Sequence, residues 1–272
     1  MTLIARSNRE ARAFSTSDAK TVASGLTTQI DHIVVVAHTL EQGVAWCEAT
    51  LGITPEAGGD HPQFGTHNRL FKIATPNFPL AYFEIIAIKK IAAQAANTLA
   101  NAKNTTQNKA VGARWFDMDD AALQAAVAKE PRLVHFVANT DDIQAARAAL
   151  KAQGIDRGPA VEASRPTRKG RLEWKITVRD DGQRLFNGAL PSLIQWGKSG
   201  AAEPLSLHPR NTLPRSGVSL QSVAVASPTP EKLQAAYEAI GLAGVTLTEG
   251  AANITVTLKT PKGLVALQSF GV

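Results

Sequence analysis

One pattern constrains this chain more than any other: an apolar strand followed by a capped helix, which occurs three times. The first copy begins at Gln29-Ile-Asp-His-Ile-Val-Val-Val36, a β-branched run typical of a buried strand. The second copy begins at residues 133–138 and the third at residues 220–225. A supersecondary unit that recurs must bury its apolar face against a neighbouring copy, so the repeat limits the folds that are open to the chain.

A helix of nearly constant length is predicted after each strand. In the first copy, Thr39 and Gln42 form a capping box and Gly52 stops the helix. The three predicted helices run from N-cap to stop glycine as follows: Thr39 to Gly52, Thr140 to Gly154, and Thr229 to Gly241, with Pro230 at the first helical position of the third.

Further strands after each helix complete βαβββ units. They are predicted at residues 69–74 and 80–88, 171–178 and 192–196, and 245–248, 254–258 and 264–270, with a Gly/Pro/His-rich loop at 55–67 and a short strand near 53–56. The predicted organisation is an N-terminal arm (1–28), paired modules over 29–200 (29–90 and 131–200) with a helical excursion (91–130), and a third, degenerate module (218–272). The fold class is therefore α+β.

Each unit carries one polar residue in its first strand and one in its last. Period 2 places His32 with Val34 and Val36 on one face of the first strand and Asp31 on the other. The polar pairs are His32 with Glu84, His135 with Gln195, and Ser222 with Gln268. A carboxylate in a buried strand is unfavourable unless it is paired or bound to a cation, and imidazole with carboxylate suits a divalent metal.

These residues resemble a known family. The βαβββ unit with His in its first strand and Glu in its last resembles the vicinal oxygen chelate superfamily, which includes glyoxalase I, extradiol dioxygenases and bleomycin resistance proteins. Ile30-Asp-His-Ile-Val34, Gly65-Thr-His-Asn68, the strand with Glu84 and Arg114-Trp-Phe116 are similar to its glyoxalase-like domain proteins. The resemblance covers roughly residues 29–200 well and implies a cupped mixed sheet made by two paired modules.

The resemblance also implies a metal between the two modules. The ligands would be His32, Glu84, His135 and Gln195, around a divalent Zn, Fe, Ni or Mn ion with open positions for a substrate that has two neighbouring oxygens. Gln195 departs from a carboxylate at this place, and an amide cannot accept a proton at neutral pH, so Glu84 is the candidate catalytic base. The third module, with Ser222 and Gln268, is expected to be structural.

Other readings of the same residues remain open. His32 on its own could be a core histidine, and Glu84 could form an ion pair with Arg69 or Lys72 of the neighbouring strand. The candidate substrate-binding residues are His67, Asn68, Arg69 and Trp115, although the first two could simply cap a loop and Trp115 could pack the excursion.

Composition narrows the class of protein and its partners. The formal charge of +6 suits an anionic small substrate, and the scattered basic residues argue against nucleic-acid binding. One cysteine, Cys47, predicts a reducing compartment, and the absence of a long apolar run predicts no membrane contact, so a cytoplasmic protein is expected. An odd number of modules suggests a homodimer.

The predicted function is that of a metal-dependent enzyme of lyase or isomerase type that acts on a small molecule with vicinal oxygens. Two histidines and one carboxylate would also suit an Fe(II) ring-cleaving dioxygenase. The alternative from another class is a metal-free binding or resistance protein that holds a small molecule in the cup. The substrate itself is not encoded in any recognisable motif.

Overall fold

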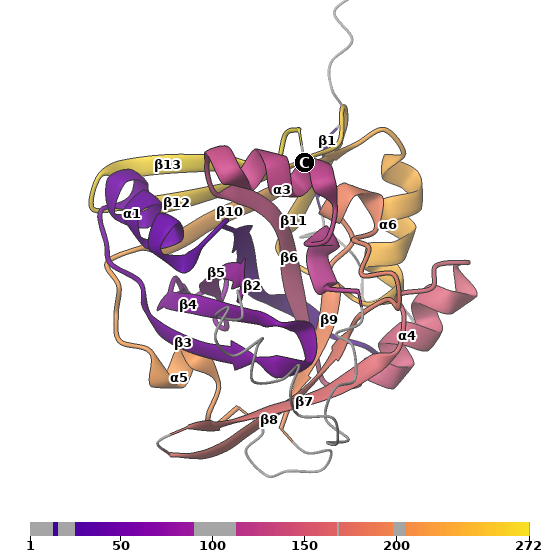
Figure 1. Cartoon of the computed structure of the whole chain (residues 1–272). Coiled ribbons are helices and arrows are strands. Elements are labelled where there is room, and N and C mark those ends of the chain that lie inside the picture. The colour runs from indigo at the N-terminus through magenta and orange to yellow at the C-terminus, as the bar shows by residue number, and fades with distance from the viewer. Residues whose placement is uncertain (1–12, 16–24, 90–112, 168, 198–204, 272) are drawn as a thin grey trace, which may run out of the picture.

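The computed structural model describes residues 13–15, 25–89, 113–167, 169–197 and 205–271. Two modules follow one another along the chain (Figure 1). The first contains β2 (Thr28–Val36), α1 (Leu40–Leu51), β3 (Glu56–His61), β4 (Thr66–Lys72) and β5 (Tyr82–Ile88). The second contains β6 (Arg132–Thr140), α4 (Ile143–Ala152), β7 (Ala160–Thr167), β8 (Gly170–Thr177) and β9 (Ser192–Trp196).

The strands of both modules form one eight-stranded mixed sheet with the order β3-β4-β5-β2-β6-β9-β8-β7. The two first strands, β2 and β6, are antiparallel at its centre, and each runs parallel to the last strand of its own module. The edge strands β3 and β7 approach each other, so the sheet curves into a nearly closed cup. The predicted α+β fold of paired βαβββ modules with a cupped sheet is confirmed.

The caps of α1 lie where the local sequence predicts them, whereas the start of α4 differs from the prediction. Thr39 accepts a hydrogen bond from the Gln42 N–H at 3.2 Å, and Gly52 ends α1 with a φ of 76°. The second helix begins later than predicted. Thr140 remains in β6, and Asp142 is the N-cap because its carboxylate accepts from two N–H groups of the first turn.

The third unit forms its own five-stranded sheet together with the N-terminal strand β1 (Ala13–Ser15), with the order β1-β11-β10-β12-β13. Its elements are β10 (Ser219–Ser227), α6 (Pro230–Ala239), β11 (Val245–Glu249), β12 (Asn253–Thr260) and β13 (Gly263–Gln268). Here β10 lies between β11 and β12, so the last strand does not lie beside the first as it does in the other modules. Ser222 and Gln268 are therefore not on neighbouring strands.

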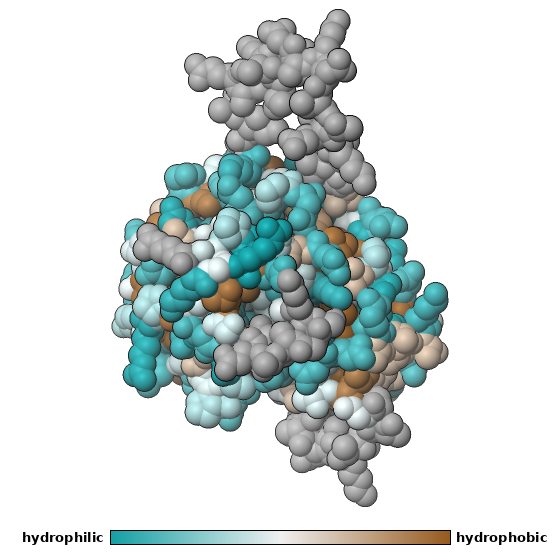
Figure 2. Space-filling view, turned by 90° about the horizontal axis from the view of Figure 1, so that it is seen from below, coloured by the Kyte–Doolittle hydropathy of each residue, from teal (hydrophilic) through white to brown (hydrophobic). Residues whose placement is uncertain are grey.

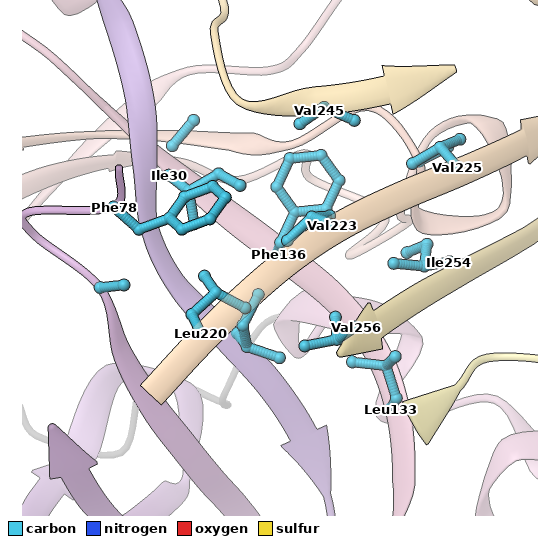
Figure 3. Close-up of a cluster of buried hydrophobic side chains, with 14 of the residues drawn as sticks. Ile30, Phe78, Leu133, Phe136, Leu220, Val223, Val225, Val245, Ile254 and Val256 are labelled. Atoms are coloured by element: carbon cyan, nitrogen blue, oxygen red, sulfur yellow. The ribbon is translucent and has the colours of Figure 1, made fainter. Parts of the chain in front are cut away.

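The main hydrophobic core lies between the outer face of the cup and this second sheet. Ile30 of β2 and Phe136 of β6 meet Val223 of β10 and Ile254 of β12 (Figure 3). The third unit thus buries its apolar face within the same chain, which removes the argument for a homodimer from an odd number of modules. Dimer formation itself stays a prediction.

The remaining described segments join these layers. From the predicted arm, Ala13–Ser15 form β1, which pairs antiparallel with β11, and residues 1–12 and 16–24 lie outside the described residues. From the predicted excursion, a 3-10 turn at Trp115–Asp117 and α3 (Ala121–Lys129) are described, and residues 90–112 are not. A short helix, α5 (Pro209–Thr212), closes the link to the third unit.

Two further observations concern partners. Within the described part of the chain, no helix is both long and apolar enough to cross a membrane. On the face seen in Figure 2, hydrophilic residues predominate and hydrophobic ones are scattered among them rather than gathered in one patch.

Candidate active site

A β-bulge in β2 sets the geometry of the site. Ile30 pairs with Ala138 and His32 pairs with Val137, so Asp31 is an extra residue in the ladder. Asp31 consequently lies beside His32, and the two side chains are joined by a hydrogen bond. The prediction that these residues point to opposite faces was wrong, because strict alternation does not survive a bulge.

Asp31 is a buried carboxylate that accepts three hydrogen bonds. Its donors are His32 Nδ1 at 2.7 Å, Trp196 Nε1 at 2.9 Å and His208 Nε2 at 3.0 Å. Burial alone would raise the pKa of Asp31, but His208 and His32 outweigh it and hold this pKa well below its usual range. An ionised Asp31 therefore fixes the proton of His32 on Nδ1 and aims Nε2 into the cup.

Glu84 stands opposite the free nitrogen of His32. Its Oε2 lies 3.6 Å from His32 Nε2, and its Oε1 accepts from Asn68 Nδ2 at 2.5 Å. Tyr82, on the same strand, stacks on the His32 ring with centroids 4.5 Å apart. The hydrogen-bond partner of Glu84 on β4 is thus Asn68, and the alternative ion pairs with Arg69 or Lys72 are not among the described contacts.

These groups line a small cavity of about 30 Å³ inside the cup. The first module supplies most of its polar side chains, and the second module supplies a largely apolar wall together with Arg165. The lining consists of His32, His61, Asn68, Leu70, Tyr82, Glu84, Trp115, Phe116, Arg165, Leu172, Trp174, Ile176, Ile194, Trp196 and Pro209. This volume holds one or two water molecules, so any larger ligand requires the aromatic side chains to move.

The second module places its histidine differently. His135 and His32 each lie eight residues before the following helix, so they are equivalent, and the residue equivalent to Glu84 is Ser192. His135 Nδ1 donates to the Gly188 carbonyl at 2.8 Å, and Nε2 accepts from the Ser192 N–H at 2.9 Å. Phe116 packs against this ring, and His135 does not line the cavity.

An arginine completes this second arrangement. The guanidinium of Arg157, which is 3% exposed, lies 3.4 Å from His135 Nε2 and also donates to the Ser192 hydroxyl. Burial, followed by the nearby Arg157 charge, lowers the pKa of His135 well below its ordinary value. Gln195 lies elsewhere, where its Oε1 accepts from the Ile143 N–H at the start of α4.

The four predicted metal ligands are therefore not brought together. His32 and Glu84 face each other in the cavity, whereas the lone pairs of His135 and Gln195 accept N–H groups of this chain and a buried guanidinium lies on His135. Among the described residues, no group of three or more His, Cys, Asp or Glu side chains has the arrangement of a metal site. The donor set does not fit the ion that the resemblance implies.

The predicted substrate-binding residues divide between the two faces of β4. Asn68 is buried and lines the cavity, as does Trp115 from the 3-10 turn. His67 and Arg69 alternate with Asn68 along the strand and do not line the cavity.

Sequence reasoning missed several residues of the site: Asp31, Tyr82, Arg165, Trp174, Trp196 and His208. Asp31 was the one with a recognisable signal, since an aspartate inside an apolar strand needs a partner. Strand pairing brings Tyr82, Arg165, Trp174 and Trp196 to the cavity, and the segment at the start of α5 brings His208 to Asp31; the sequence does not reveal these contacts.

His61 gives a pH-dependent prediction. Burial, followed by the charge of Arg165, lowers its pKa from 6.5 to about 3. Between these values the unfolded chain binds a proton at this site and the folded chain does not, so the free energy of unfolding should decrease as pH falls below 6.5. The slope from one such group is up to about 1.4 kcal/mol per pH unit.

Urea unfolding of wild type and His61→Gln at pH 7, 6 and 5 measures this contribution. The variant should lose less stability on acidification, because glutamine does not titrate, while the buried His135 contributes equally in both proteins. Identical pH dependence in the two proteins would contradict the prediction.

Comparison of the sequence with known protein families identifies the family of this chain. A family model described as Glyoxalase-like domain matches residues 30–241. A hypothetical protein from Staphylococcus aureus has a similar fold, at 14% identity and a TM-score of 0.52 over 83% of this chain and 87% of that chain.

Two weaker likenesses are to methylmalonyl-CoA epimerases. The Streptomyces coelicolor enzyme is 17% identical over 63% of this chain and 95% of its own, with a TM-score of 0.35. The Mycobacterium tuberculosis enzyme is 14% identical over 65% and 89%, with a TM-score of 0.32. The comparison with curated proteins found no match. The family match spans most of the sequence, and the chain therefore belongs to the Glyoxalase-like domain family, with the fold of the vicinal oxygen chelate superfamily.

Proposed function

We propose that this protein is an enzyme of lyase or isomerase type that moves a proton on a small molecule with vicinal oxygens. The observation that carries the proposal is the buried Asp31–His32–Glu84 arrangement in the cup. Asp31 orients the imidazole of His32, and Glu84 lies opposite the other nitrogen of that ring. His32 and Glu84 are therefore a suitable pair for general acid–base chemistry.

The proposed step begins at a carbon next to a carbonyl group. Glu84 takes the proton from this carbon, the electron pair of the C–H bond forms a C=C bond, and the π pair of the C=O bond moves to the oxygen to give an enolate. For this step His32 takes up a second proton, from solvent, on Nε2 and donates a hydrogen bond from it to that oxygen, while Asp31 stabilises the imidazolium. Delivery of the proton to the former carbonyl carbon, or to the opposite face of the first carbon, completes an isomerisation, and loss of a group from the next carbon completes an elimination.

The surroundings of the pair suit this chemistry. Glu84 is 5% exposed and His32 is 4% exposed, so the enolate would form away from water, where electrostatic stabilisation is stronger. Asn68 holds one oxygen of Glu84 and leaves the other directed at His32.

The metal-dependent form of the predicted function has less support. His135 would be needed as a ligand, and its two nitrogens already have partners in the chain. The same observation weakens the alternative of an Fe(II) ring-cleaving dioxygenase, since His135 does not line the cavity and the described residues hold no group of three His, Cys, Asp or Glu side chains with the arrangement of a metal site.

Elemental analysis tests this point directly. Protein expressed with Fe, Zn, Ni and Mn supplied should have the same metal content as His135→Ala, because His135 is not a ligand. About one metal per chain in the wild type that disappears in a folded His135→Ala protein would restore the four-residue site.

The second candidate is a binding or resistance protein without catalysis. The apolar wall from the second module, including Trp174 and Trp196, favours it because aromatic side chains hold small molecules by packing alone. A cytoplasmic location stays a prediction for both candidates.

Exchange of carbon-bound hydrogen with D2O, followed by proton NMR, tests the proposed enzyme. The panel consists of 2-oxobutanoate and 2-hydroxybutanoate, which have vicinal oxygens, and of 3-oxobutanoate, which does not, for comparison; the chelator EDTA is included in a parallel series. Exchange that is faster than in buffer alone, and that requires Glu84, supports the proposal. Binding without exchange for the whole panel would favour the binding protein.

A further inference from the structure

We propose that Arg165 forms a recognition subsite for the carboxylate of an anionic substrate. The proposal rests on the proposed function for the position of the reacting carbon, and it adds the chemical class of the substrate: a small organic acid. The geometry that supports it comes from β7, the edge strand of the second module, where it faces the edge strand of the first.

Arg165 brings an unused positive charge to the cavity. It lines the cavity, and its Nη1 atom is buried without a hydrogen-bond partner among the described residues. A buried guanidinium N–H without a partner is unfavourable, and a carboxylate oxygen is the acceptor that best relieves it.

A glycine in β3 makes this position possible. An ideal Cβ on Gly59 would lie 2.2 Å from Arg165 Nη1, so a side chain at position 59 would displace the guanidinium from its present place. The adjacent Gly58 does the same for Asn68, since its Cβ would lie 1.9 Å from Asn68 Oδ1. The pair Gly58-Gly59, which reads as a loop signal in the sequence, lies within β3 and lets two polar side chains reach the site.

A second donor accompanies Arg165. The indole nitrogen of Trp115 is buried and also has no partner among the described residues, and Trp115 lines the same cavity at 4% exposure. Two unpartnered donors and the Glu84–His32 pair thus share one cavity. A molecule with a carboxylate next to a carbonyl carries acceptors for Arg165 and Trp115, and the C–H group beside its carbonyl offers a proton to Glu84.

Arg165 also lies where the cavity meets the outside. A groove of about 990 Å³ runs along β3 and β7, and it shares Arg165, Leu70, Leu172 and Pro209 with the cavity. Lys169 lines the outer part of the same groove. The groove provides a path for entry, and because Glu56 and Asp60 also line it, the attraction for an anion is local to Arg165 at its inner end.

The charges around the cavity favour an anion at the Arg165 end and disfavour one at the His32 end. Asp31 and Glu84 place negative charge at the His32 end, which would repel a carboxylate. Arg165 is the one Lys or Arg side chain in the described lining of the cavity. A bound organic acid is therefore oriented with its carboxylate toward Arg165 and its other end toward Glu84.

The test compares carboxylates with neutral analogues. Binding of 2-oxobutanoate and oxalate, and of methyl 2-oxobutanoate, is measured by calorimetry and by quenching of tryptophan fluorescence on wild type, Arg165→Met and Arg165→Lys. We expect Arg165→Met to weaken carboxylate binding by about tenfold to a hundredfold. Lysine should recover part of this loss, and binding of the ester should change little in either variant.

Two further variants make the result specific. Arg171→Met removes an exposed arginine on the neighbouring strand that contacts Ser164 and should leave carboxylate binding unchanged. Gly59→Ala keeps Arg165 but displaces its guanidinium, so it should weaken carboxylate binding as well. Circular dichroism and urea unfolding confirm that each variant is folded.

The outcomes separate this inference from the proposed function. Carboxylate binding that depends on Arg165 but is not followed by exchange in D2O would support the subsite and count against the enzyme. Exchange that proceeds equally well with acid and ester, and is unchanged in Arg165→Met, would support the enzyme and overturn the subsite. No carboxylate binding by the wild type in the millimolar range would also overturn the subsite.

Discussion

Replacement of His32 by asparagine is expected to reduce the rate of hydrogen exchange on an organic acid by about 10²- to 10⁴-fold. Asparagine can still donate to Asp31 from the position of Nδ1, so the buried hydrogen bond is retained. It has no group at the position of Nε2, and the enolate oxygen loses its donor. The measurement is the exchange rate in D2O by NMR at saturating substrate.

Glu84→Gln should lower the same rate by a similar factor, because an amide cannot take the proton. Carboxylate binding should survive in both variants, since Arg165 lies at the other end of the cavity. His38→Asn, a histidine that does not line the cavity, serves as the matched control and should keep the wild-type rate. A wild-type rate in His32→Asn would rule out the proposed role of its imidazole.

Asp31→Asn is expected to lower the free energy of unfolding by about 3 kcal/mol. The carboxylate is fully buried and accepts from His32, Trp196 and His208, whereas an asparagine would turn an N–H₂ group toward at least one of these donors. The variant therefore leaves buried donors unpaired and removes the charge that faces two histidines. Urea unfolding at pH 7 measures the loss.

Trp196→Phe is the comparison for this prediction. It removes one of the three donors and leaves the charge, so a loss of about 1 kcal/mol is expected. The exchange rate should also fall in Asp31→Asn, because the His32 ring loses its orientation. A stability within about 0.5 kcal/mol of the wild type would show that the hydrogen bonds around Asp31 contribute little.

Where local chemistry decides the structure, the sequence was a good guide. The strand at Gln29–Val36 and the N-cap at Thr39 are specified by residues that are close in sequence, and both were predicted correctly, although the Gln42 side chain accepts from the His38 N–H rather than from the Thr39 N–H of a capping box. The equivalence of His32 and His135 also follows from the repeat. The pairing of modules needed the family resemblance, because no local interaction specifies which strands meet.

The site was only partly predictable. His32 and Glu84 come together as the repeat suggested, and both the first and the last strand of the module are required for this contact. In the second module, the register of β9 brings Ser192 to the equivalent place and sends Gln195 to α4, a shift of three residues that sequence spacing did not show.

By itself, the sequence determined the repeat, the helices and the two polar residues that face each other in the first module, because periodicity and capping act over a few residues. Tertiary structure alone decided three things: the bulge that turns Asp31 toward His32, the placement of Arg157 on His135, and the approach of β7 to β3 that brings Arg165 past Gly59. Each depends on strand register and on contacts between residues far apart in the chain, and such contacts are set by the packing of the whole cup.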